Sequence, residues 1–203
     1  MMSPSIWSRS MKSPGALLKR FATDGRGVAA VEFACLAPIV VLMLFGTLEA
    51  SRALAVDRRF NLATSMVADL VGRETKLTAN DVNAIYNIVA QVMSPFDASP
   101  LKISLIPVKA SSTDASSTKV YAATTNRPSY HGGVQPAKCA SFPLTAGLVA
   151  KGGSVIVVKT SYDYTPAVIG YLWGSSTWTE QAIVSPRNSC VDFDTNNCVS
   201  TCF

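Results

Sequence analysis

A single carboxylate, Glu32, lies inside an otherwise uncharged and mostly apolar run from Val28 to Leu48. At a rise of 1.5 Å per residue, this run would cover about 31 Å as a helix, which matches the hydrocarbon core of a bilayer. A charged side chain inside a membrane span costs roughly 2.5–3.5 kcal/mol on insertion scales, so it usually marks a function or a buried partner. We therefore predict one membrane helix over residues 28–48, with Glu32 as its functional carboxylate.

Basic residues precede this run. Residues 1–27 contain five of the 18 Lys and Arg residues and one of the 13 Asp and Glu residues, which leaves 13 basic and 12 acidic residues beyond them. The positive-inside rule keeps such a leader in the cytoplasm, so the rest of the chain is expected to be exported. That exported part lacks the basic stripe of a nucleic-acid-binding surface, and we exclude this role. A secretory signal is the alternative, but Glu32 would hinder its insertion without benefit.

Cysteine usage fits an exported domain. Cys35 lies in the apolar run, whereas the other four cysteines, Cys139, Cys190, Cys198 and Cys202, fall beyond it. An oxidising compartment favours disulfides, and four cysteines allow three connectivities that the sequence does not separate. Zinc is the competing explanation, but there is no Cys-x-x-Cys pair and the only histidine, His131, stands apart. We expect two disulfides and no metal.

Residues that could catalyse a reaction form no recognisable set. His131 is alone, no Gly-x-Ser-x-Gly or phosphate-binding loop stands in the right context, and the exported carboxylates Asp163, Asp192 and Asp194 suggest no acid–base pair. We expect no catalytic residue, no cofactor and no small-molecule substrate.

The helices that position these residues follow from hydrophobic spacing. After the membrane run, apolar residues recur at intervals of three and four: Ala53, Val56, Phe60, Ala63, Val67 and Leu70. This spacing predicts an amphipathic helix over residues 49–74 that continues the membrane helix. Its apolar stripe either packs on the chain's own exported domain or forms a seam between subunits. A second helix is predicted from the capping-box pattern at residues 78–81, with Val82, Ile85, Ile88, Val89 and Val92 on its buried face.

Strands follow the second helix. Alternating residues predict a strand over residues 101–105, which Pro107 restricts to a sheet edge or truncates. Further strands are predicted near residues 119–124, at residues 154–164, and at residues 177–185, the last antiparallel to the strand before it. The apolar connection between these last two strands, residues 165–176, is either a hairpin folded over the sheet or a loop that contacts a membrane or a partner. The tail is expected to be irregular and held by disulfides.

The expected fold is therefore α+β, with a long N-terminal transmembrane and amphipathic helix, a second helix and a small antiparallel sheet. The domain organisation is a basic cytoplasmic leader (residues 1–27), a transmembrane helix (28–48), an amphipathic extension (49–74) and an exported domain with a cysteine-rich tail (75–203).

The first helix resembles a known family. Residues 27–33 read Gly-Val-Ala-Ala-Val-Glu-Phe, and Gly46, Glu49 and Arg52 follow at characteristic positions. These residues resemble the amino-terminal signature of TadE-like pseudopilins (TadE/TadG family), which assist assembly of tight-adherence (Flp-type) type IV pili. The resemblance implies a pilin-like periplasmic domain, placement in the inner membrane, and pilins and pilus assembly proteins as partners. It also implies that a prepilin peptidase cuts after Gly27, which makes Val28 the new amino terminus and places Glu32 and Phe33 just behind it.

Glu32 has a chemical reason to be retained if this cleavage occurs. The new α-amino group at Val28 would be positive, and a nearby carboxylate in low dielectric could neutralise it within one helix turn or on an adjacent subunit. The alternative is an uncleaved single-pass anchor whose exported domain binds a partner or a surface.

Overall fold

The structure, a computed structural model, describes residues 27–167, 170, 174–193, 198 and 202–203. The basic leader therefore lies outside the described residues, apart from Gly27. The chain divides into two compact units, Met1–Thr47 and Leu48–Phe203.

Helix α2 (Val28–Arg73) contains 46 residues and includes both predicted helical segments. In the first unit its large apolar side chains are exposed. In the second unit Val56, Phe60 and Val67 are buried in the main core together with residues of the sheet. The apolar stripe therefore packs on the chain's own domain, which is the first of the two alternatives.

Helix α3 (Ala79–Val92) begins at the predicted capping box. The Asp81 N–H donates to Thr78 Oγ1 over 3.3 Å, and the Thr78 N–H donates to Asp81 Oδ2 over 2.9 Å. Three of the residues predicted on its buried face, Val82, Ile85 and Val89, are buried. Ile88 was predicted to be buried with them, but its side chain is 51% exposed. Tyr86 is buried instead. It lies four positions after Val82 and three before Val89, which is the spacing of residues on one face of a helix.

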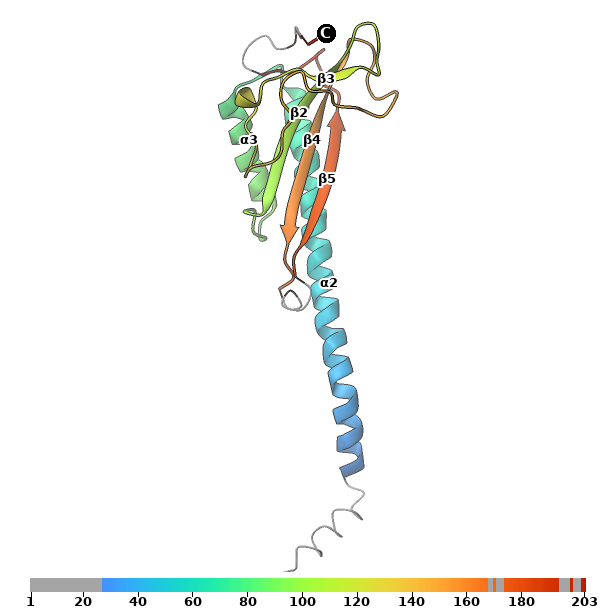
Figure 1. The fold of residues 1–203 in the computed structure, drawn as a ribbon. Coiled ribbons are helices and arrows are strands. Elements are labelled where there is room, and N and C mark those ends of the chain that lie inside the picture. The colour runs from blue at the N-terminus through green and yellow to red at the C-terminus, as the bar shows by residue number, and fades with distance from the viewer. Residues whose placement is uncertain (1–26, 168–169, 171–173, 194–197, 199–201) are drawn as a thin grey trace, which may run out of the picture. The chain divides into compact units, whose positions relative to one another are not determined.

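Four strands form one antiparallel sheet in the order β3-β2-β4-β5 (Figure 1). They are β2 (Leu101–Ala110), β3 (Thr118–Val120), β4 (Ser154–Tyr164) and β5 (Ser176–Val184). β4 has the predicted bounds, and β5 pairs with it as predicted, with Tyr162 opposite Trp178. β3 is shorter than predicted. The fold class is α+β, as expected.

Both faces of the sheet carry buried residues. On one face Ile103, Leu105 and Val158 pack with α2 and α3 in the main core. On the other face a second cluster contains Ile106 and Val157, and Phe142 and Leu144 of the irregular region between β3 and β4 pack against it. Burial on both faces explains the continuous apolar run at the start of β4, because alternation is expected only where one face is solvated.

The prediction for Pro107 was wrong. Pro107 lies inside β2, which has neighbours on both sides and continues to Ala110. The carbonyl of Pro107 accepts a hydrogen bond from the Tyr121 N–H over 3.1 Å, so the hydrogen-bonding side of this residue faces β3. The ladder between β2 and β3 begins only at Val108. The missing N–H of the proline therefore falls just outside that ladder and leaves the pairing with β4 intact.

A buried arginine organises part of the irregular region between β3 and β4. Arg127 has no exposed surface, and its guanidinium donates to the carbonyls of Leu105, Ala122 and Pro136. Burial lowers the pKa of Arg127 to about 10. One of these carbonyls belongs to β2 and the other two to irregular segments, and together they satisfy the buried cation. The short helix η2 (Thr124–Asn126) ends just before Arg127.

Two short strands join the cysteine-rich tail to the start of the domain. β1 (Lys76–Leu77) pairs in parallel with β6 (Asp192–Phe193). The sequence did not indicate this pair. It places Phe193 in the main core, so the tail contributes apolar burial as well as disulfides.

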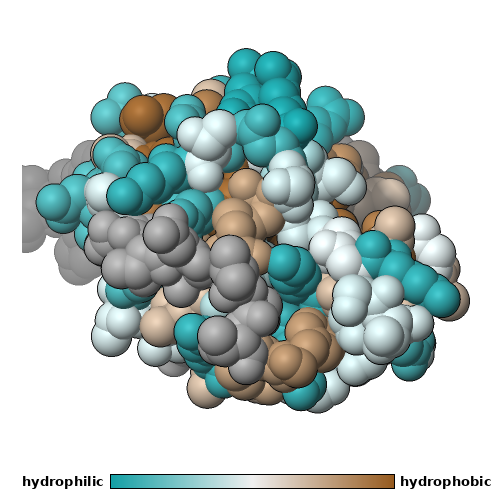
Figure 2. Space-filling model, turned by 90° about the horizontal axis from the view of Figure 1, so that it is seen from above, coloured by the Kyte–Doolittle hydropathy of each residue, from teal (hydrophilic) through white to brown (hydrophobic). Residues whose placement is uncertain are grey.

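The exposed large apolar side chains concentrate in the first unit. Most of them lie between Val28 and Leu48. On the face of the molecule drawn in Figure 2, hydrophilic residues separate small apolar areas from one another. The segment 28–48 therefore carries the main unburied apolar surface among the described residues.

Candidate functional site

The predicted cleavage and pairing residues lie at the start of α2. Gly27 immediately precedes the helix, and Val28 is its first residue. Glu32 is exposed and, within the described part of the chain, makes no hydrogen bond or ion pair. Residues four positions apart lie on the same face of a helix, so Glu32 is one turn from Val28. Phe33 is 71% exposed beside it.

Helix α2 has the length and composition of a membrane span. It is the one helix of this kind in the described residues, and the apolar window that qualifies it is not buried inside the protein. Gly46 lies in the apolar run of residues 28–48, and a Cβ added to it would meet no atom within 4 Å. Packing within the described chain therefore does not require a glycine there.

Glu49 begins a site that joins α2 to the sheet. It directly follows the apolar run, and only 8% of its surface is exposed. Its Oε1 accepts a hydrogen bond from the Tyr164 hydroxyl over 2.7 Å and one from the Ala167 N–H over 3.0 Å. Tyr164 is the last residue of β4. The carboxylate thus fixes the end of β4 and the start of the following connection on the first helical turn after the apolar run.

Aromatic stacking supports this contact. The Tyr164 ring stacks on Trp178 of β5 with ring centroids 4.5 Å apart and an interplanar angle of 13°. Burial, assisted by the hydrogen bond to Glu49, raises the pKa of Tyr164 to about 12. The tyrosine therefore remains a neutral donor to the carboxylate at physiological pH.

Two further contacts align β4 with α2. The hydroxyls of Thr64 and Thr160 are hydrogen-bonded over 2.6 Å in a buried position. The rings of Phe60 and Tyr162 lie 6.0 Å apart. Together with Glu49, these contacts place alternate residues of β4 along α2 (Figure 1).

The four cysteines beyond the apolar run form two disulfides. Cys139 bonds to Cys202 with Cα atoms 5.1 Å apart, and Cys190 bonds to Cys198 with Cα atoms 5.8 Å apart. Cys35, in the apolar run, is free and exposed. The structure thus selects one of the three connectivities that the sequence left open.

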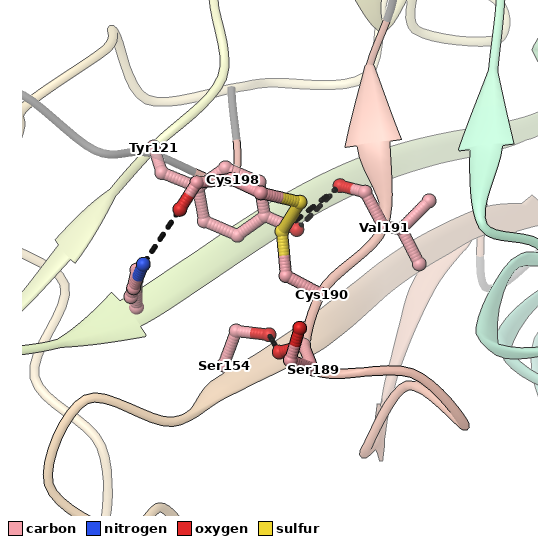
Figure 3. Close-up of a disulfide and its surroundings, with 7 residues drawn as sticks. Tyr121, Ser154, Ser189, Cys190, Val191 and Cys198 are labelled. Atoms are coloured by element: carbon pink, nitrogen blue, oxygen red, sulfur yellow. Dashed lines mark hydrogen bonds between the residues drawn. A yellow bond between two sulfur atoms is a disulfide. The ribbon is translucent and has the colours of Figure 1, made fainter. Parts of the chain in front are cut away.

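Hydrogen bonds anchor the segment that carries the second disulfide (Figure 3). The Tyr121 hydroxyl donates to the carbonyl of Val191 over 2.9 Å, and the Ser154 hydroxyl donates to the carbonyl of Ser189 over 2.8 Å. Cys190 lies between these two carbonyls in sequence. The disulfide therefore extends from a segment already attached to β4 and to the core.

The carboxylates and the histidine do not gather into a recognisable centre. Among the residues that the structure describes, no three His, Cys, Asp or Glu side chains could hold a metal ion together. Asp163 accepts hydrogen bonds from Thr177 and Lys102, which hold the pKa of its carboxyl below the usual value. Asp192 lies in β6, and Asp194 lies outside the described residues.

The comparison with protein families identifies the first helix. Residues 27–69 match the model of the family described as TadE-like protein. This segment of the chain is similar to TadE-like proteins. The match includes Gly27, Glu32, Gly46, Glu49 and Arg52, and it supports a place in the Tad pilus system, with membrane association and pilus partners. Neither the curated proteins nor the solved structures include a match to the chain.

The structure also shows what the sequence did not indicate about the TadE-like segment. In the sequence, Glu49 stands out only as part of the segment that resembles the family signature. The residues that donate to it, Tyr164 and Ala167, are more than 100 positions away. The aromatic end of β4 was visible in the sequence. No local pattern linked it to a carboxylate on the first helix.

Proposed function

We propose that this TadE-like protein is a minor pseudopilin of a tight-adherence (Flp-type) pilus. A prepilin peptidase removes the leader after Gly27, and the mature protein then assists pilus assembly from the inner membrane. It acts by helix insertion and contact with other pilins and pilus assembly proteins, not by catalysis. The single observation that carries the proposal is the family match over residues 27–69, which covers Gly27 together with the exposed apolar part of α2.

The position of Glu32 supports this role. The carboxylate is one helical turn from Val28 and has no partner in the described part of the chain. Cleavage would create a cationic amino group at Val28, and a charge pair within the same or an adjacent subunit would offset the cost of the carboxylate in the membrane. Such a pair between subunits would also fix their register.

Charge and disulfides support the proposed orientation. The basic leader favours a cytoplasmic amino terminus. The two disulfides of the second unit favour an oxidising compartment, which in this topology is the periplasm.

The deciding experiment is the mass and amino-terminal sequence of the protein from its native membrane, with and without the prepilin peptidase. We expect Val28 as the first residue when the peptidase is present and an intact leader when it is deleted. An intact leader in both strains would instead favour the uncleaved anchor, whose exported domain binds a partner.

A further inference from the structure

A pocket of about 240 Å³ lies beside the first turns of α2 that follow the apolar run. Arg52 lines it from α2, Phe96, Asp97 and Pro100 from the connection between α3 and β2, and Tyr162 and Tyr164 from the end of β4. The volume is below the roughly 300–1,000 Å³ of pockets that hold drug-sized ligands. It therefore suits a group smaller than a drug-sized ligand.

Arg52 is an unpaired cation at this pocket. Its side chain is exposed, and within the described part of the chain it makes no hydrogen bond or ion pair. A guanidinium has five donors in a planar fork that matches phosphate, so an unoccupied fork beside a pocket is suited to a phosphate group.

Asp97 supplies the opposite charge at the same pocket. The N–H of Ser99 donates to Asp97 Oδ1 over 2.9 Å, and hydrogen bonds from the Ser99 hydroxyl and N–H hold the pKa of Asp97 below its usual value. The carboxylate is therefore ionised at neutral pH. Although Asp97 and Arg52 line one pocket, they form no ion pair with each other. A second carboxylate, Asp163, also lines the pocket, but it accepts hydrogen bonds from Lys102 and Thr177. Among the described residues, Arg52 and Asp97 are therefore the two charged groups of the pocket that form no ion pair.

The distance along the helix places Arg52 at a defined depth if residues 28–48 span the membrane, as the proposed function requires. Arg52 is four residues past Leu48, which is about 6 Å of helix. A bilayer has a hydrocarbon core of about 30 Å and a total thickness of about 40–45 Å, so each headgroup layer is roughly 5–8 Å thick. Arg52 therefore falls in the layer that contains the lipid phosphates. Aromatic side chains such as Tyr162 and Tyr164 are typical of this layer.

We propose that this pocket binds the headgroup of a zwitterionic phospholipid, with Arg52 on the phosphate and Asp97 on the ammonium group of an ethanolamine. The bound lipid lies in the leaflet that faces the second unit. Because Tyr164 lines the pocket and donates to Glu49, lipid binding and the contact between β4 and α2 share one residue. The headgroup therefore stabilises the attachment of β4 to the helix at the membrane surface.

The test uses the full chain, extracted in mild detergent and analysed by native mass spectrometry with added phosphatidylethanolamine. We expect the wild type to retain one phosphatidylethanolamine and Arg52→Gln to bind it about tenfold more weakly, the scale for loss of a charged hydrogen bond. Arg58→Gln is the matched control, because Arg58 is also an exposed arginine of α2 but does not line the pocket. It should bind as the wild type does.

Three further measurements separate the lipid from other anions and from misfolding. Inorganic phosphate should not raise the thermal unfolding temperature of the full chain at concentrations where short-chain phosphatidylethanolamine does. Asp97→Asn should remove the preference for phosphatidylethanolamine over phosphatidylglycerol. Without added lipid, all three variants should unfold at temperatures close to that of the wild type.

The proposal is overturned if Arg52→Gln and the wild type bind phosphatidylethanolamine equally, if inorganic phosphate stabilises the chain as well as the lipid does, or if the wild type shows no preference over phosphatidylglycerol. Alkaline extraction of membranes tests the topology on which it rests. A chain that alkali removes from the membrane contradicts the proposed function as well. A chain that stays in the membrane but fails the lipid tests contradicts the pocket alone.

Discussion

At the scale of single residues, the TadE-like segment contains two carboxylates in contrasting environments. Glu32 is exposed on the apolar part of α2 without a partner among the described residues, whereas Glu49 is buried and accepts two hydrogen bonds. A buried carboxylate is stable only when its oxygens are hydrogen-bonded or paired. Glu49 is therefore a structural residue of the second unit, whereas the described residues offer Glu32 no partner.

The contact between Tyr164 and Glu49 should contribute measurably to stability. Tyr164→Phe removes one hydroxyl and leaves the ring in place, so Glu49 loses the hydrogen bond from Tyr164. We expect the free energy of unfolding to fall by about 1.5–3 kcal/mol, as for hydrogen bonds to charged groups. Urea denaturation of the full chain in detergent, followed by tryptophan fluorescence, measures the change because Trp178 stacks on this ring.

Tyr86→Phe is the matched control for this variant. The Tyr86 hydroxyl is buried and has no hydrogen-bond partner among the described residues. Removing an unsatisfied buried hydroxyl should leave the free energy of unfolding unchanged or raise it. Equal destabilisation by both variants would show that ring packing, and not the bond to Glu49, dominates at Tyr164.

At the scale of elements, the sequence predicted a helix or strand correctly where the local residue pattern was strong. The β4 bounds came from a dense run of β-branched residues, and the start of α3 came from a capping box, both of which are local signals. The pair β1 and β6 was missed because two-residue strands have no period and lie more than 100 positions apart. Pro107 was misjudged because the cost of a proline depends on where the neighbouring ladder begins, which only the assembled sheet determines.

The two disulfides should differ in their contribution to stability. Cys139 and Cys202 are separated by 63 positions, and Cys190 and Cys198 by eight. On the chain-entropy model, closing the longer loop stabilises by about 4 kcal/mol and closing the shorter one by about 2.5 kcal/mol. The variant with Cys139 and Cys202 both replaced by Ala should therefore have the lower urea midpoint.

Reduction provides the control for this comparison. The wild type treated with a reductant should be less stable than either double variant left oxidised. The opposite order is also informative. If the variant with Cys190 and Cys198 replaced by Ala were the less stable, this disulfide would stabilise the segment near Val191 by more than its loop length predicts.

At the scale of the whole molecule, the second unit should fold without the membrane segment. Val56, Phe60 and Val67 are covered by the chain's own core, so residues 48–203 need no second subunit to bury them. Exported to the periplasm behind a cleavable signal, this fragment should be a soluble monomer with a single cooperative unfolding transition. Light scattering coupled to size-exclusion chromatography measures its mass. A stable dimer would instead support the alternative that the apolar stripe of α2 packs between subunits.

The proposed role of Glu32 is tested in the assembled system, because the amino group proposed to pair with it forms only when the chain is cleaved before Val28. Glu32→Ala removes the carboxylate but leaves Gly27 and Val28 unchanged, so we expect normal cleavage and normal membrane insertion. Removing one member of a buried charge pair typically costs 3–5 kcal/mol, since the other charge is left uncompensated. Co-purification of the mature protein with the major pilin should therefore fall by about tenfold or more.

Glu74→Ala is the control that shows whether the effect depends on where along the chain the carboxylate is removed. It removes the same group from an exposed site just after α2 ends, where water can solvate any charge left behind. We expect it to cleave, insert and co-purify as the wild type does. If Glu32→Ala also co-purified normally and piliation were unaffected, Glu32 would be a tolerated polar residue at the edge of the bilayer. Assembly would then depend on other contacts, of which the exposed apolar side chains of residues 28–48 are the first candidates.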